Sequence, residues 1–397
     1  MVDGARVSRR AAAIRPFAVM DVVARAKELQ AAGHDVVRLE IGDPDLPTPE
    51  VVTRAAEAAM EQGETGYTQS AGLPSLREAI SDHYRSTYGV VVDPDDVVVT
   101  QGTSPAMLLV FGALLDPGDE VIVGGPCYPA YPNYVSFLGG VPVTVPVRAE
   151  DGFRFRLDEV RAAITPATRA IMVNSPANPT GAVLPFEDLQ GLAAIAEEHG
   201  IWLVSDEIYH GLDFSGRSRS VLECTERAFV LNGFSKAYAM TGWRLGYLIA
   251  PRAFVRACEK IQQNFFLCAN HFVQVAGTVA LTSAQDDVAR MRAVYDERRR
   301  YLVPALAEIG LGIACEPLGA FYVFADARAW GADSLELSRR ILEEAFVSTA
   351  PGIDFGPEGE GFLRFSYATS QDRLAEGVAR LDAWARTIRD RERAHDG

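Results

Sequence analysis

A lysine has an unusual setting in N-G-F-S-K-A-Y-A-M-T-G-W-R-L-G-Y, residues 232–247. An apolar run, Ala228 to Leu231, predicts a buried strand that delivers Lys236 into a turn rich in Gly, Ser and Thr. Desolvation there would lower the pKa of the amine, so that part of it could condense with an aldehyde. The alternative is a lysine whose stem packs on Tyr238 and Trp243 while its amine stays in water.

Two neighbours of this lysine suit a phosphate group. Ser235 supplies a hydroxyl, and Arg244, eight positions after Lys236, supplies a cation. An amine for an aldehyde beside donors for a phosphate predicts an anchor for pyridoxal phosphate (PLP).

Strands alternate with helices over much of the chain. Strands are predicted at residues 97–100, 120–123, 170–174, 202–205, 228–231 and 245–250, with helices at 106–115 and 186–199. This alternation indicates a mostly parallel sheet covered on both faces, in which ligands gather at the carboxyl ends of the strands. The polar candidates follow directly on predicted strands: Thr103, Ser104, Asn178, Asp206 and Lys236.

Three residues suit the ring of PLP. Asp206, in L-V-S-D-E-I-Y, would place a carboxylate against the pyridine nitrogen and keep that nitrogen protonated. Tyr209, three residues later, and Asn178, in N-S-P-A-N-P-T-G, could reach the phenolic oxygen. The alternatives are a helix N-cap or turn carboxylate for Asp206, packing for Tyr209 and an Asx-turn for Asn178.

Other candidates also have two interpretations. Thr103 and Ser104 precede a helix, where they would point hydroxyls and amides at an anion or serve as plain N-caps. Tyr128, in G-P-C-Y-P-A-Y, could lie over the pyridine, with Tyr131 as a competitor and core packing as the alternative. Arg364, between apolar neighbours on a strand, either reaches the surface or offers a two-pronged contact to a substrate carboxylate.

Composition limits the class of protein. The 397 residues, 48% of them hydrophobic, predict two domains. A formal net charge of −15 argues against nucleic-acid and anionic-membrane partners. Five cysteines form no C-x-x-C pair, which favours a reduced, cytoplasmic setting. No run approaches a membrane span, and the apolar stretch 11–14 is too short for a signal peptide.

The two ends of the chain predict a second α+β domain. Near the N-terminus we expect a helix at 19–32, a strand at 36–41 and the loop G-D-P-D-L-P-T-P at 42–49. The helices expected next, at 49–62 and from 74 or 75, belong to the predicted large domain. Beyond residue 284 we expect a long helix to 309, strands at 312–315, 320–325 and 362–367, and a helix at 372–391. The predicted large domain covers residues 48–283, and the small one covers 1–47 and 284–397.

Four segments, in this order and spacing, resemble one family: Asn178-Pro-Thr-Gly, Asp206-x-x-Tyr209, Ser235-Lys236-x(7)-Arg244 and Arg364. They are similar to the class I and II PLP-dependent aminotransferases, the aspartate aminotransferase superfamily of fold type I, over about residues 17–381. The resemblance implies a large domain with a mostly parallel seven-stranded sheet flanked by helices, a smaller α+β domain, and a homodimer with active sites at the subunit interface.

The resemblance also implies roles. Lys236 would bind PLP as an aldimine and serve as acid and base for the 1,3-proton shift, while Asp206, Tyr209 and Asn178 hold the ring. No metal is implied. The expected phosphate ligands are Thr103, Ser104, Ser235, Arg244 and the partner subunit's Tyr67; the expected substrate contacts are Gly42, Tyr128, Asn178 and Arg364.

The expected reaction moves the amino group of an L-amino acid to a 2-oxo acid by a ping-pong mechanism. The segments R-P-F-A-V-M, at 15–20, and N-F-F-L-C-A-N, at 264–270, favour a neutral or aromatic donor. Aspartate is the alternative, with Arg15 and Arg38 as candidate contacts. The competing hypotheses are a lyase, oxidase or decarboxylase on the same fold, and a non-catalytic ligand-binding regulator.

Overall fold

A seven-stranded sheet forms the centre of the protein, whose computed structural model describes residues 6–395. Its strand order is β2-β8-β7-β6-β5-β3-β4. All neighbouring pairs are parallel except the two that β8 makes, so the predicted mostly parallel sheet is confirmed. The strands are β2 (Val97–Thr100), β3 (Glu120–Gly125), β4 (Val141–Pro146), β5 (Thr168–Asn174), β6 (Trp202–Asp206), β7 (Ala228–Gly233) and β8 (Gly246–Ile249).

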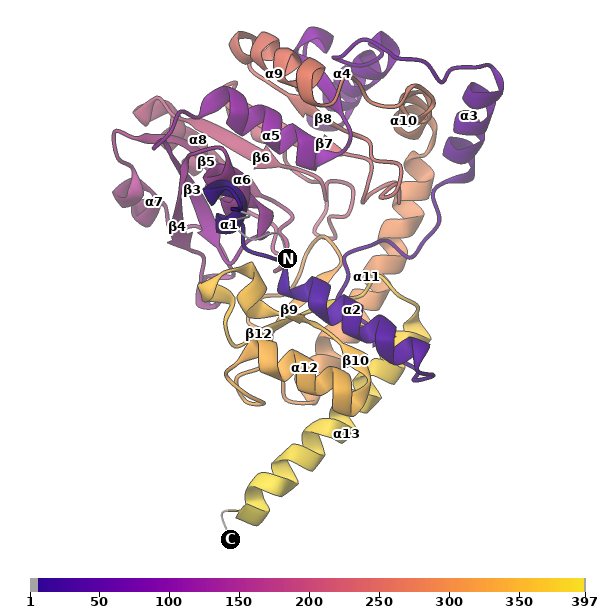
Figure 1. Cartoon of the computed structure of the whole chain (residues 1–397), viewed down its shortest axis with the longest axis vertical. Helices are drawn as coiled ribbons and strands as arrows, with labels where there is room; N and C mark the ends of the chain where they lie inside the picture. The colour runs from indigo at the N-terminus through magenta and orange to yellow at the C-terminus, as the bar shows by residue number, and fades with distance from the viewer. Residues whose placement is uncertain (1–5, 396–397) are drawn as a thin grey trace.

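Helices cover both faces of this sheet (Figure 1). In β2, Val98 packs with helices of one face, whereas Val97 and Val99 belong to the core of the other, as the alternation of a strand requires. One face carries α5 (Thr103–Leu114), α6 (Ala130–Phe137) and α9 (Arg252–Phe265). The other carries α4 (Pro74–Tyr88), α7 (Leu157–Ala163), α8 (Phe186–His199) and α10 (His271–Ser283), with α3 (Glu50–Glu61) against α10.

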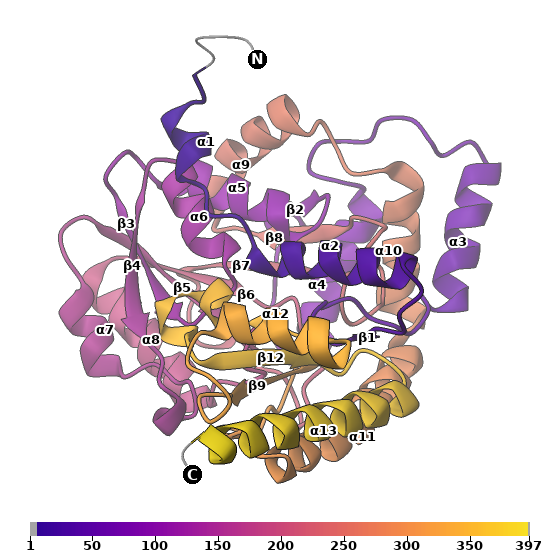
Figure 2. The same ribbon diagram turned by 60° about the horizontal axis from the view of Figure 1, so that its bottom comes forward.

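The two ends of the chain form a smaller α+β unit around two small sheets (Figure 2). One is the antiparallel sheet β11 (Ala350–Pro351), β12 (Phe362–Ser366), β9 (Tyr322–Asp326); the other is the parallel pair β1 (Val37–Arg38), β10 (Val347–Ser348). Around them lie α2 (Ala18–Ala31), α11 (Gln285–Glu308), α12 (Ser334–Ala345) and α13 (Gln371–His395), whereas α1 (Arg9–Ala13) lies beside α6. The domain boundaries at residues 47/48 and 283/284 stay predictions. Across residues 6–395, none of the helices is both long and apolar enough to span a membrane.

Two predicted strands needed correction. The prediction of a strand at residues 312–315 is wrong: Gly312 makes only an isolated bridge to Asp326, and the chain bends at Cys315 before reaching Pro317. The strand predicted at 36–41 shortens to β1, Val37–Arg38. The unpredicted β4, V-P-V-T-V-P, contains prolines because it is an edge strand, where a missing N–H costs no ladder bond.

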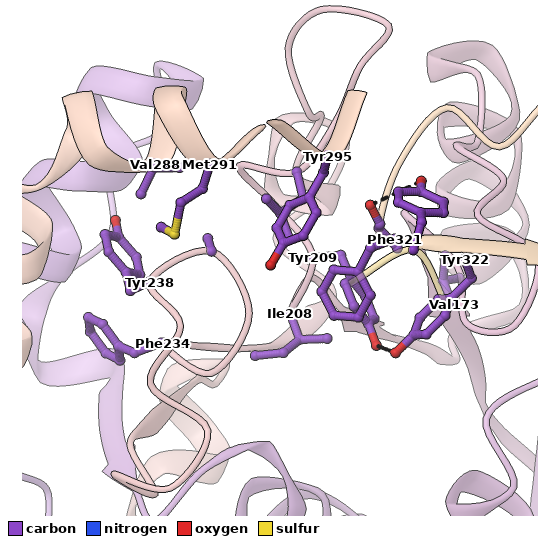
Figure 3. Close-up of a cluster of buried hydrophobic side chains, with 14 of the residues drawn as sticks. Val173, Ile208, Tyr209, Phe234, Tyr238, Val288, Met291, Tyr295, Phe321 and Tyr322 are labelled. Carbon is purple, nitrogen blue, oxygen red and sulfur yellow. Dashed lines mark hydrogen bonds between the residues drawn. The ribbon is translucent and has the colours of Figure 1, made fainter. Parts of the chain in front are cut away.

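An aromatic cluster joins α11 to the edge of the large sheet (Figure 3). Phe321 is fully buried between Tyr295 of α11 and Tyr209, with ring centroids 5.4 and 5.7 Å away. Rings at such distances contribute stability beyond their buried area. The cluster therefore fixes Tyr209, which follows β6, against Tyr322 of β9.

An ion pair between a buried arginine and a solvent-exposed aspartate holds the loop after β1. Arg298 of α11, 8% exposed, donates to both carboxylate oxygens of Asp45, at 2.7 and 2.9 Å. This two-pronged contact ties the segment that contains Gly42 to the long helix.

We expect Asp45→Ala to lower the free energy of unfolding by about 2 kcal/mol, because it leaves the Arg298 charge buried and unpaired. The matched control is Asp287→Ala, which removes an ion pair with the largely exposed Arg290 and should cost less than about 0.5 kcal/mol. Urea unfolding measures both variants. Equal decreases in the free energy of unfolding would show that the Asp45–Arg298 pair stabilises the protein no more than an exposed ion pair does.

Candidate active site

The carboxyl ends of β5, β6 and β7 meet at one edge of the sheet and open into a cavity of about 490 Å³. Eleven of the twelve predicted site residues line this cavity. They are Gly42, Thr103, Ser104, Tyr128, Asn178, Asp206, Tyr209, Ser235, Lys236, Arg244 and Arg364. The exception is Tyr67, which is 85% exposed on a loop outside the cavity.

Lys236 points into this cavity. Its Nζ donates to the carbonyl oxygen of Gly42 at 2.6 Å. Burial lowers the pKa of the amine to about 8, although the carboxylate of Asp43, also at the cavity, acts in the opposite direction. A substantial fraction of the amine is therefore neutral near physiological pH and able to attack an aldehyde. The alternative, an amine left in bulk water, is wrong.

The start of α5 and the end of the lysine loop form an anion-binding corner. The helix begins at Thr103, and its N-cap is Gly102 rather than Thr103 or Ser104, so no side chain caps its amides. Gly102 has φ +95°, and a Cβ there would lie 2.8 Å from the Arg244 guanidinium. A helix N-terminus beside a guanidinium suits a phosphate. Thr241, also at the cavity, was not predicted.

Asp206 is a buried carboxyl at the end of β6. It accepts from the hydroxyl of Tyr131 at 2.8 Å and from the amide of Ile208 at 3.2 Å, so the predicted local turn contact exists as well. Burial raises its pKa to about 6 despite these donors. The contact of Tyr131 was not predicted. Tyr131 therefore orients the carboxyl, while Tyr128 lies half-buried at the cavity with its ring centroid 5.4 Å from that of Tyr131.

Tyr209 meets a residue that the sequence did not point to. Its hydroxyl lies 2.9 Å from that of Tyr322, as Figure 3 shows. The Tyr322 hydroxyl also fills the space above Gly42, where a Cβ would approach it to 1.8 Å. Gly42 is thus required by the close approach of a side chain.

Arg364 is 5% exposed, so the alternative interpretation, in which it reaches the surface, is wrong. It donates to Asn178 Oδ1 at 2.8 Å and to the carbonyl of Glu40 at 2.6 Å. Its guanidinium lies 4.4 Å from the ring centroid of Tyr322, and its buried Nε has no partner. A buried cation with an unused donor at a cavity wall suits an anionic ligand.

Other predicted contacts lie outside the cavity. Arg38 pairs with the buried Glu40, and Arg15 contacts Asn133 through its backbone. Neither arginine lines the cavity, and no residue of 264–270 does. The cations that line it are Lys236, Arg244 and Arg364. The lining also includes a group of apolar side chains, Phe17, Val19, Met20, Val23 and Phe355, and the carboxyl-bearing residues Glu40, Asp43 and Asp354.

Comparison with known proteins agrees with this geometry. The family model "Aminotransferase class I and II" matches residues 34–381. The chain is 42% identical to the aspartate/prephenate aminotransferase of Thermus thermophilus, over 94% of this chain and 97% of that one. It is 39% identical to the valine–pyruvate aminotransferase of Mycobacterium tuberculosis, over 96% and 98%.

Solved structures agree as well. The aspartate aminotransferase of Thermus thermophilus with maleate superposes with a TM-score of 0.92 at 42% identity, covering 96% of this chain and 99% of that one. The chain therefore belongs to the class I and II aminotransferases, PLP-dependent enzymes of fold type I that move an amino group from an amino acid to a 2-oxo acid.

Proposed function

We propose that this enzyme binds PLP covalently through Lys236 and exchanges amino groups between a neutral or aromatic L-amino acid and a 2-oxo acid by a ping-pong mechanism. The observation that carries the proposal is one cavity that gathers the low-pKa amine of Lys236, the buried carboxyl of Asp206 and the guanidinium of Arg364, whose Nε has no partner.

The residues present fit the cofactor. The amides at the start of α5, with Thr103, Ser104, Ser235 and Arg244, would hold its phosphate, and the lack of a side-chain cap leaves those amides for it. Asp206 would face the ring nitrogen, with Tyr131 orienting the carboxyl. Asn178 and Tyr209 would contact the phenolic oxygen, and Tyr128 would cover the ring.

Each residue then has a defined task. When bound, PLP supplies an electron sink for the bonds at the α-carbon of the amino acid. Lys236 Nζ would take the α-proton of the substrate and hold it as an ammonium until it is returned, a role that suits a pKa of about 8. Asp206 would keep the ring nitrogen protonated. Arg364 and Asn178 orient the substrate through its α-carboxylate.

The cavity favours donors with an uncharged side chain. Its three cations already have tasks: Lys236 in proton transfer, Arg244 at the phosphate and Arg364 at the α-carboxylate. A second carboxylate would instead face Phe17, Val19 and Phe355, where an unpaired charge is costly. The valine–pyruvate relative provides a precedent for such donors.

A homodimer is part of the proposal. Tyr67 and Phe265, the last residue of α9, are 85% and 71% exposed. The loop of Tyr67 meets the segment after α9, where the Thr68 amide donates to Cys268 Sγ at 3.4 Å. A second copy would cover this apolar surface and receive Tyr67 at its phosphate site. A cytoplasmic location, from the unpaired cysteines, remains a proposal too.

Attachment of the cofactor should depend on pH through the amine of Lys236. Because only the neutral amine attacks an aldehyde, the rate at which PLP joins cofactor-free protein should rise about tenfold per pH unit and level off above pH 8. Visible absorbance after mixing measures this rate, and Lys236→Ala should show no such phase. A rate still rising toward pH 10, as for an ordinary lysine, would contradict the assignment.

A donor panel tests the side-chain preference. With pyruvate as acceptor, kcat/KM for phenylalanine or valine should exceed that for aspartate by about tenfold or more, because aspartate would bury an unpaired carboxylate. Product 2-oxo acids can be quantified by chromatography. A kcat/KM for aspartate equal to or higher than that for phenylalanine and valine would contradict the preference for neutral donors.

Arg364→Lys should lower kcat/KM about a hundredfold, mainly through KM, because lysine cannot offer the two-pronged contact of a guanidinium. The matched control is Arg328→Lys, an exposed arginine that pairs with Asp326 away from the cavity. Steady-state kinetics with one donor compare the two. Similar small decreases of kcat/KM in both variants would show that Arg364 does not bind the substrate.

A further inference from the structure

Phe17 lies at the cavity between two anchored pieces of backbone. It lines the cavity as the N-cap residue of α2, and its ring centroid is 6.0 Å from that of Tyr128. Its own side chain cannot cap the helix, so α2 begins without a local cap. The position of Phe17 therefore depends on contacts made by distant residues.

The first anchor is Asp354, in the 3-10 turn Gly352–Phe355. Its Oδ1 accepts from the amide of Ala18 at 2.7 Å and its Oδ2 from the amide of Val19 at 3.2 Å. A carboxylate at this position satisfies two amides of the first turn and interacts favourably with the helix dipole. A residue more than 330 positions away thus caps α2.

The second anchor is Asn133 of α6. Its Oδ1 accepts from the amide of Arg15, and its Nδ2 donates to the carbonyl of Arg15, both at 3.1 Å. Only Pro16, whose ring restricts φ, separates this clamp from Phe17. The backbone is therefore held on both sides of Phe17, at Arg15 before it and at Ala18 and Val19 after it.

The turn with Asp354 also holds a second part of the cavity lining. The carbonyl of Phe355 accepts from the amide of Cys127 at 2.9 Å, directly before Tyr128. The Phe355 ring itself lines the cavity and lies 4.9 Å from the Arg364 guanidinium. The turn therefore connects Phe17, Tyr128 and the carboxylate-binding arginine.

We propose that Asp354 and Asn133 are positioning residues that hold Phe17 and the first turn of α2 against the donor side chain, and that they thereby set the preference for large apolar donors. The inference rests on the proposed function for its link to specificity. The clamp itself can be tested without turnover.

The key variant is Asp354→Ala, compared with Asp333→Ala in the holoenzyme. Asp333 caps α12 by accepting from the Glu336 amide at 2.9 Å and, unlike Asp354, does not line the cavity, so it controls for the loss of a helix cap alone. Hydrogen exchange of the peptide covering residues 15–23 should be about fivefold faster in Asp354→Ala and unchanged in the control. Asn133→Ala should accelerate exchange in the same peptide.

The kinetic readout is the ratio of kcat/KM for phenylalanine to that for alanine, whose methyl group reaches less of the apolar wall. This ratio should fall about fivefold in Asp354→Ala and stay constant in Asp333→Ala, with Asp354→Asn intermediate because its amide keeps one acceptor oxygen.

The two proposals fail in different ways. Unchanged exchange over residues 15–23 would overturn the clamp, whatever the activity. Faster exchange with an unchanged donor ratio would overturn the link to specificity. A wild-type enzyme that uses neither donor would overturn the proposed function, and with it the specificity role, while exchange would still report on the clamp.

Discussion

Burial of charged groups at one edge of a parallel sheet is the constraint on which this structure depends. An ammonium, a carboxyl and a guanidinium are withdrawn from water at Lys236, Asp206 and Arg364. Desolvation shifts the pKa of the amine down and that of the carboxyl up, toward values at which each can hold or move a proton near neutral pH. The surrounding fold must stabilise these groups, and a bound anionic cofactor and substrate would supply the missing partners.

Two parts of the chain, far apart in sequence, bring these groups together. The large sheet supplies the amine and the carboxyl at successive strand ends, whereas β12 supplies the guanidinium. The loop after β1 lies between them: the Gly42 carbonyl accepts from Lys236, and the Glu40 carbonyl accepts from Arg364. Arg298 binds the same loop through Asp45, so this ion pair contributes to the geometry of the site.

Local sequence pattern predicted the parts of the site that follow strands. Asp206 and Lys236 follow apolar runs within a few residues, and parallel strands end at one edge, so their meeting could be expected. Tyr131, Tyr322 and Asp354 could not be found in this way, since each acts on a residue at least 75 positions away through packing that no local spacing encodes. The strand predicted at 312–315 failed for a related reason: an apolar tetrapeptide pairs only where a neighbouring strand is available.

The most direct test of the account is the site of attachment of the cofactor. The sequence contains only three lysines, Lys27, Lys236 and Lys260, and of these Lys236 alone lines the cavity. Borohydride reduction of the holoenzyme followed by peptide mapping and mass spectrometry would locate the pyridoxyl group. We expect the added mass on the peptide that contains Lys236, as its assignment as the anchor requires. Modification of Lys27 or Lys260 in its place, or no modification of a protein loaded with PLP, would contradict it.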